Sequence, residues 1–214
     1  SFSICNLPPE YRYQTANLMC TSIMPGLKEQ SPDEVQHFLH PIISDLLRLW
    51  KHSIKVPTES HPDRRVIHVI LVAVVCDKPT AHKMGGFGSH SHTYYCTACW
   101  IPSKDKGNLN AFKRGAYPLQ TDWEQCHLGN EYHNLDSLNA QKNFVKEYAT
   151  QYSELSRLPY FDLVQQIVID PMHNLFLGKF QPSPNDQPLP VLHRSRQDAL
   201  LQYLGPKQDL MTKP

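Results

Sequence analysis

The sequence predicts an α/β fold, and three stretches of the chain indicate it. Segment 66–76 is almost continuously apolar and rich in β-branched residues, which is typical of a central strand buried on both faces. Segment 33–51 repeats apolar residues at spacings of three and four, as a long amphipathic helix does. Segment 1–5 alternates like a strand. Strand, long helix and buried strand in this order predict a sheet with a helix packed against it.

The helix prediction rests on start signals as well as on periodicity. Ser31 is a good N-cap, Pro32 suits the first helical turn, and Asp33 and Glu34 face the positive end of the helix dipole. Pro41 lies inside the predicted helix and is a candidate kink. Further local patterns predict helices over 10–23 and 134–157, a short edge strand at 55–57, and a short apolar segment at 165–169.

Composition is that of a folded protein and excludes few functions. The chain has 214 residues, of which 40% are hydrophobic, and its formal net charge is +1. This near-neutral balance argues neither for nor against DNA as a partner, although dedicated DNA-coating domains are usually basic. No run of about eighteen apolar residues and no signal peptide is visible, which predicts an intracellular protein with reduced thiols and no membrane partner.

Asp77 is the first candidate for chemistry. It directly follows the predicted buried strand and precedes Lys78 and Pro79, so the strand ends there. A carboxylate at the carboxyl end of a central strand is where α/β folds place catalytic groups. An aspartate that only caps the next turn explains the same position equally well.

The pair Cys96 and Cys99 is the second candidate. Two cysteines separated by two residues can direct both thiolates at one Zn²⁺ ion, but they supply only half of a tetrahedral site. The histidines are the natural source of the other ligands; His127 and His173 are preferred, with His90, His92 and His133 in reserve. The alternative is a hairpin with two thiols and no metal.

Asp170 and His173 form the third candidate. Asp170 followed by Pro171 predicts a helix start, and residues three apart on a first turn lie on one face. Judged by themselves, these residues favour the simpler explanation, in which the aspartate caps the helix and the histidine packs.

Taken in order, these motifs resemble the CACTA (En/Spm-like) DNA transposases, in the form found in fungal genomes. The most specific blocks are Val75-Cys76-Asp77-Lys78-Pro79-Thr80-Ala81 and Asp170-Pro171-Met172-His173-Asn174-Leu175-Phe176-Leu177-Gly178. The resemblance covers residues 1 to about 180. The other matching stretches are 6–12, 25–26, 38–50, 86–90, 96–99, 153–155 and 158–162.

The resemblance implies a partial ribonuclease-H-like core at 1–80, a mostly helical, loop-rich insertion with the Cys-x-x-Cys motif at 81–180, and an unmatched Pro-rich tail at 181–214. It implies that Asp77 is the second of three catalytic acids and binds Mg²⁺, that Cys96 and Cys99 help to hold a structural Zn²⁺, and that Asp170 and His173 lie near the active site. It also implies DNA transposon ends as partner, a homo-oligomer, a nuclear location and no small-molecule substrate.

Two catalytic carboxylates of the family pattern fall outside this sequence. The first aspartate is expected upstream of Ser1, and the final glutamate beyond Gly178, where segment 181–214 contains no glutamate. Two Mg²⁺ ions need several carboxylate ligands, so we expect the chain to be a fragment that is inactive alone.

Two other functions fit parts of the pattern. A non-catalytic, zinc-stabilised DNA-binding or interaction module would use Cys96 and Cys99 without cleaving DNA. A zinc hydrolase would need three close protein ligands and an open coordination position. The sequence contains no His-Glu-x-x-His motif, which argues against the hydrolase.

Overall fold

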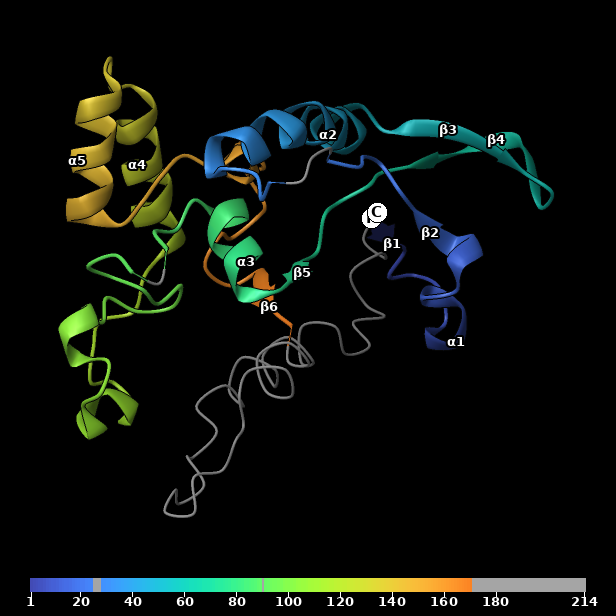
Figure 1. Cartoon of the computed structure of the whole chain (residues 1–214). Helices are drawn as coiled ribbons and strands as arrows, with labels where there is room; N and C mark the ends of the chain where they lie inside the picture. The colour runs from blue at the N-terminus through green and yellow to red at the C-terminus, as the bar shows by residue number, and fades with distance from the viewer. Residues whose placement is uncertain (25–27, 90, 171–214) are drawn as a thin grey trace.

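The computed structural model describes residues 1–24, 28–89 and 91–170. Its central element is helix α2 (Pro32–His52), which runs across the middle of the molecule in Figure 1. Below it lie helix α3 (Lys78–Gly85) and the short strands β5 (Val74–Cys76) and β6 (Ile167–Ile169). Within the described ranges the strands form three two-stranded sheets.

Helix α2 confirms the predicted long helix. Ser31 accepts a hydrogen bond from the Glu34 backbone N–H at 3.3 Å, and the Glu34 carboxylate accepts from the Ser31 N–H at 2.7 Å. This capping box satisfies two of the N–H groups that a helix start leaves unpaired. Pro41 lies inside the helix without interrupting it. The helix buries one stripe of apolar side chains: Val35, Leu39, Ile43 and Leu46.

The hydrophobic core joins α2 to parts of the chain that lie more than a hundred residues later. Leu155, Leu158 and Phe161 pack with the apolar stripe of α2 and with Ala81 of α3. Between them, the amide of Gln36 donates to the Lys83 carbonyl at 2.8 Å and accepts from the Glu154 N–H at 2.7 Å. The core therefore draws on both the 1–80 and the 81–180 stretch.

The single buried strand predicted over 66–76 is wrong, because the structure divides it. Strand β4 (His61–Ile67) pairs antiparallel with β3 (Ile54–Thr58) in a hairpin that projects from the molecule in Figure 1. Strand β5 begins only at Val74. Val66 is 51% exposed and Val75 is 60% exposed, so no second layer covers these side chains.

Side chains replace strand partners in the intervening segment. The Leu71 N–H donates to the Tyr160 hydroxyl at 3.3 Å, and the Gln166 amide donates to the Val72 carbonyl at 2.8 Å. Backbone groups bound in this way do not need a neighbouring strand. The predicted edge strand at 55–57 is confirmed as part of β3.

The helix predicted over 10–23 is also wrong. The structure has a short helix α1 (Pro9–Arg12), a 3-10 turn (Thr15–Asn17) and a strand β2 (Leu18–Met19) that pairs with β1 (Phe2–Ser3). No residue of α1 is buried, so a longer helix here would have no apolar face to stabilise it. The predicted opening strand is confirmed as the two residues of β1.

Two helices lie side by side at one end of the molecule in Figure 1, α4 (Asp122–His133) and α5 (Leu138–Tyr148). Two 3-10 turns, Ser103–Asp105 and Leu109–Phe112, precede them, and a third, Glu154–Arg157, follows. The helix predicted over 134–157 is thus divided, because Ala149 adopts a left-handed conformation (φ 50°) and ends α5. The ribonuclease-H-like architecture stays a prediction.

Candidate active site

Asp77 and Asp170 follow the ends of two neighbouring parallel strands. In the β5–β6 pair, Val74 is opposite Ile167 and Cys76 is opposite Ile169, so the next residue on each strand is an aspartate. The ladder continues one step further, since the Asp170 N–H donates to the Cys76 carbonyl at 2.7 Å. Neighbouring strands lie about 4.8 Å apart, which places the two aspartates side by side at one sheet edge.

Asp77 has a definite structural role in this arrangement. One of its carboxylate oxygens accepts a hydrogen bond from the Thr80 N–H at 2.8 Å and caps α3, with Pro79 in the first helical turn. The capping interpretation of Asp77 is therefore confirmed. A cap uses one lone pair of a carboxylate that has about four acceptor sites, so capping and metal binding are compatible.

The far end of α3 is fixed by a tight backbone contact. Gly86 caps the helix in the left-handed region (φ 71°), and its carbonyl accepts from the Gln151 N–H at 2.7 Å. A Cβ at Gly86 would lie 2.3 Å from the Gln151 carbonyl oxygen, which no side chain tolerates. The buried His82 imidazole hydrogen-bonds the Gly88 carbonyl. These contacts hold α3, and with it Asp77, in place.

Two lysines, of which Lys78 follows Asp77 in the chain, share one aromatic ring. The Lys78 ammonium lies 5.7 Å from the centre of the Tyr95 ring, and the Lys106 ammonium lies 5.4 Å from it. Burial is the main cause that lowers the pKa of Lys78. The charge of Cys96 acts in the opposite direction and raises this pKa, whereas the charge of Lys106 lowers it. Burial is also the main cause that raises the pKa of Tyr95, and the charges of Cys96 and Cys99 raise it further. Through Lys78, the residue that follows Asp77 is thus connected to Tyr95 and to the cysteine turn.

The Cys-x-x-Cys segment is a turn fastened to α4. The Ala98 N–H points at the Cys96 sulfur at 3.4 Å. The buried Gln120 amide donates to the Cys96 carbonyl at 2.8 Å and to the Cys99 carbonyl at 3.4 Å, and Gln125 holds Gln120 in turn. Such a turn, with an N–H directed at a sulfur, suits two ligands of a Zn²⁺ ion.

Three of the histidines proposed as further zinc ligands lie among the described residues, and each has another partner. His127 lies on α4, stacked on Trp123, with Nε2 3.3 Å from the Glu131 carboxylate. His92 Nδ1 is 2.8 Å from the Ser89 hydroxyl, and the His133 ring contacts Tyr152. Over the described ranges, no three His, Cys, Asp or Glu side chains gather as a metal site. The Zn²⁺ site stays a prediction.

Two of the predicted site residues lie outside the described residues: His90 and His173. Of the three candidates proposed from the sequence, the structure brings Asp77 and Asp170 together and places Cys96 and Cys99 close by through Lys78. The grouping of Lys78 and Lys106 around Tyr95 was not recognised from the sequence. The available signal was that both aspartates follow three apolar residues, Val-Val-Cys and Ile-Val-Ile.

Comparison with known proteins identifies the class. A family model described as "Transposase family tnp2" matches residues 2–118, which include Asp77, Cys96 and Cys99. Searches among curated proteins and among solved structures found no match. The chain is thus a transposase by family. Within that class, the chain belongs to the transposase family tnp2. None of the helices described in the structure is long and apolar enough to cross a membrane.

Proposed function

We propose that this chain is part of the catalytic core of a cut-and-paste DNA transposase of the CACTA type, with a ribonuclease-H-like architecture. In this proposal Asp77 is a catalytic carboxylate, and Asp170 lies beside it as a second acidic group. The observation that carries the proposal is the in-register pairing of β5 with β6, which ends both strands in an aspartate at the same edge. Family membership supports a transposase.

The residues at this edge suit Mg²⁺. Mg²⁺ prefers hard oxygen ligands, and carboxylates from two parallel strands supply them at one place. When bound, divalent ions activate a water molecule and stabilise the leaving oxygen of a phosphodiester. Asp77 and Asp170 would hold such an ion. The capping bond from Thr80 fixes the orientation of the Asp77 carboxylate beforehand, which reduces the cost of ordering it on binding.

The neighbouring lysines give the same region a role in holding DNA. Lys78 and Lys106 both lie over Tyr95, and a pair of ammonium groups on one ring, one of them on the residue that follows Asp77, is suited to a DNA phosphate. Because the ammonium of Lys78 is partly desolvated, its attraction to a phosphate is stronger than that of a fully hydrated lysine. The proposal includes transposon ends as partner, a nuclear location and a homo-oligomer on paired ends.

The test is Asp77→Asn in a transposase chain that supplies the two other catalytic carboxylates. Asparagine is as good an N-cap as aspartate, so the substitution keeps the cap of α3 and removes the charge. We expect DNA strand cleavage with Mg²⁺ to fall by at least about 100-fold. Melting temperature and DNA affinity should be unchanged.

Asp136→Asn is the matched control, because it makes the same chemical change at an exposed position. It should cleave DNA like the parent chain. Cleavage by Asp77→Asn at the control rate would show that Asp77 only caps α3. Asp170→Asn tests the second carboxylate in the same assay, and a reduced rate is expected there as well.

A non-catalytic, zinc-stabilised DNA-binding or interaction module is the second candidate. The turn at Cys96 and Cys99, fastened through Gln120, favours it. Such a module predicts close to one zinc per chain by elemental analysis, lost in Cys96→Ser, and DNA binding that does not depend on Mg²⁺. Strand cleavage by a chain completed with the other carboxylates contradicts it.

A further inference from the structure

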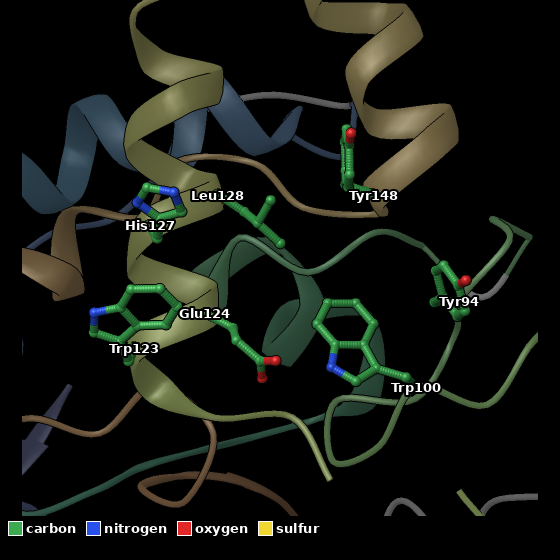
Figure 2. A pocket seen from close by; sticks show the side chains of 7 residues that line it. All are labelled: Tyr94, Trp100, Trp123, Glu124, His127, Leu128 and Tyr148. Carbon is green, nitrogen blue, oxygen red and sulfur yellow. The ribbon is translucent and has the colours of Figure 1, made fainter. Parts of the chain in front are cut away.

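A cavity with aromatic walls lies between α4, α5 and the cysteine turn, away from the paired aspartates. Its volume is about 340 Å³. Figure 2 shows Trp123 and His127 on one side, Trp100 and Tyr94 on the other, and Tyr148 above. A cavity of this size, at the lower end of the usual range for ligand pockets, accommodates a small group or one side chain.

The aromatic rings that line the cavity are ordered by contacts with one another. Tyr94 and Trp100 meet edge to face, with ring centres 5.4 Å apart and planes at 82°. Trp123 stacks on His127, with ring centres 5.2 Å apart and planes at 8°. Trp123 nevertheless stays 72% exposed, so its ring remains accessible to a ligand. Rings held in position at a surface cavity are preorganised for binding.

The cavity carries a fixed negative charge. Figure 2 shows the Glu124 carboxylate between the two tryptophans. One of its oxygens accepts from the Thr121 N–H at 3.0 Å and from the Thr121 hydroxyl at 2.8 Å, in the capping box of α4. Among the described residues that line the cavity there is no lysine or arginine.

Charge and surface together select the ligand class. A DNA phosphate would be repelled by Glu124 and would find no cation at the wall. A neutral apolar group would partly remove the Glu124 carboxylate from water without offering it a partner, which costs free energy. A cation with an apolar surface satisfies both features, because aromatic faces attract it and the carboxylate neutralises it. An N-methylated ammonium is such a cation.

We propose that this cavity binds the trimethylammonium head of a methylated lysine side chain from a protein partner. The cavity has room for an alkyl stem beside the head, and Leu128 offers an apolar surface for it. A choline phospholipid headgroup carries its own phosphate, which would lie close to Glu124 and be repelled. The inference is independent of any catalytic role of Asp77.

The test is a fluorescence titration of the full chain with four peptides of one neutral sequence. They differ at a single position, which carries lysine, trimethyl-lysine, the uncharged carbon isostere of trimethyl-lysine, or alanine. We expect trimethyl-lysine to bind at least ten times more tightly than each of the other three. Weak binding of the carbon isostere would show that the positive charge, and not only the methyl surface, is recognised.

Two variants locate the binding to this cavity. Trp123→Ala removes one wall and should weaken trimethyl-lysine binding by at least tenfold. Glu124→Gln removes the charge but keeps the capping box, since glutamine serves there as well as glutamate, and should weaken binding several-fold. Leu138→Ala changes a 75% exposed residue at the start of the neighbouring α5 and should bind like the parent chain.

Three results would overturn the proposal. The first is equal affinity for the lysine and trimethyl-lysine peptides. The second is equal affinity for free choline, which would mean that the carrier is not a peptide side chain. The third is Trp123-dependent binding of single-stranded oligonucleotides together with no preference for methylation, which would make the cavity a base-stacking site.

Discussion

At the scale of single residues, local environment separates groups that the sequence presents as equivalent. Cys76 and Cys126 are partly buried thiols, whereas Cys5 and Cys20 are exposed. Burial, together with the neighbouring Asp77, raises the pKa of Cys76 to about 12. Burial and Asp122 raise the pKa of Cys126 to about 12. We therefore expect these four cysteines to differ in reactivity because of what surrounds them.

Alkylation with iodoacetamide at pH 8 tests this difference. The reactive species is the thiolate, which for a pKa near 12 is roughly one part in ten thousand at this pH. We expect peptide mass spectrometry to find Cys5 and Cys20 modified first and Cys76 and Cys126 protected in the native chain. In denaturant all four should react at similar rates. Equal rates for Cys76 and Cys5 in the native chain would contradict the assigned burial.

The raised pKa values of Cys76 and Cys126 also predict how the stability of the fold changes at alkaline pH. Because the folded chain keeps these two thiol protons after the unfolded chain has lost its own, the free energy of unfolding falls as pH rises above about 9.

At the scale of elements, helix starts are specified by side-chain caps. Ser31 with Glu34 and Thr121 with Glu124 form capping boxes on α2 and α4. Ser137 caps α5 without a glutamate partner, since its side chain accepts only from the Ala140 N–H. These helices begin where their caps predict, because each cap satisfies backbone N–H groups that have no partner within the helix.

Ser31→Ala and Ser137→Ala form a matched pair for testing the caps. Each should lower the free energy of unfolding by about 1 kcal/mol at pH 7, measured by urea denaturation. Of the two losses, only part of the one from Ser31→Ala should depend on pH, because the Ser31 hydroxyl is the second of the two Ser31 groups that stabilise the Glu34 carboxylate, after the backbone N–H. Hydrogen bonds from Ser31 lower the pKa of Glu34, so this stabilisation is present above the unfolded pKa near 4.5 and is lost as pH falls through the lowered value.

The Ser31→Ala deficit should therefore narrow at acid pH without vanishing, because the bond from the Glu34 N–H to the Ser31 hydroxyl does not depend on the charge of Glu34. The Ser137→Ala deficit should stay the same. A Ser31→Ala deficit that is equal at pH 7 and at acid pH would show that the Ser31 hydroxyl does not stabilise the Glu34 carboxylate.

At the scale of the whole molecule, contacts between distant segments hold the described residues together. Strand β6 joins β5, from which it is separated by about ninety residues, and Gln36 binds both Lys83 and Glu154. Arg157 donates to Glu154 at 2.6 Å and to Ser44 at 3.1 Å. The segment that carries the cysteine turn, α4 and α5 thus leaves the core after α3 and returns to it near residue 150.

Leu158→Ala tests the unity of this core. Leu158 is 1% exposed and packs with α2, so its truncation should lower the free energy of unfolding by about 2–5 kcal/mol. Leu138→Ala is the control at an exposed position and should change the free energy of unfolding by less than about 0.5 kcal/mol. We expect Trp fluorescence and circular dichroism to report one coincident transition in urea. Two separate transitions would show that α2 and the 149–169 segment unfold independently.

The candidate site was predictable in part. Asp77 was recognisable because an aspartate after an apolar run stands out locally, and its confirmed role as a cap follows from the same pattern. The cysteine turn was recognisable from its spacing, although its zinc remains a prediction. The lysine pair over Tyr95 was not recognisable from the sequence, because these three residues are scattered between positions 78 and 106 and meet only once the chain has folded. The errors at 10–23 and 66–76 arose where no second layer covers the apolar residues.

The sequence by itself determined α2 and its caps, the strand end at Asp77 and the resemblance to a transposase family, which the match over residues 2–118 supports at the level of transposases. These depend on neighbours within a few residues, which periodicity and capping rules describe. Only the tertiary structure decided that Asp170 lies beside Asp77 and that Trp100 and Trp123 face one cavity. The physical reason is that strand pairing and side-chain packing join residues tens of positions apart, and no local pattern specifies which segments will meet.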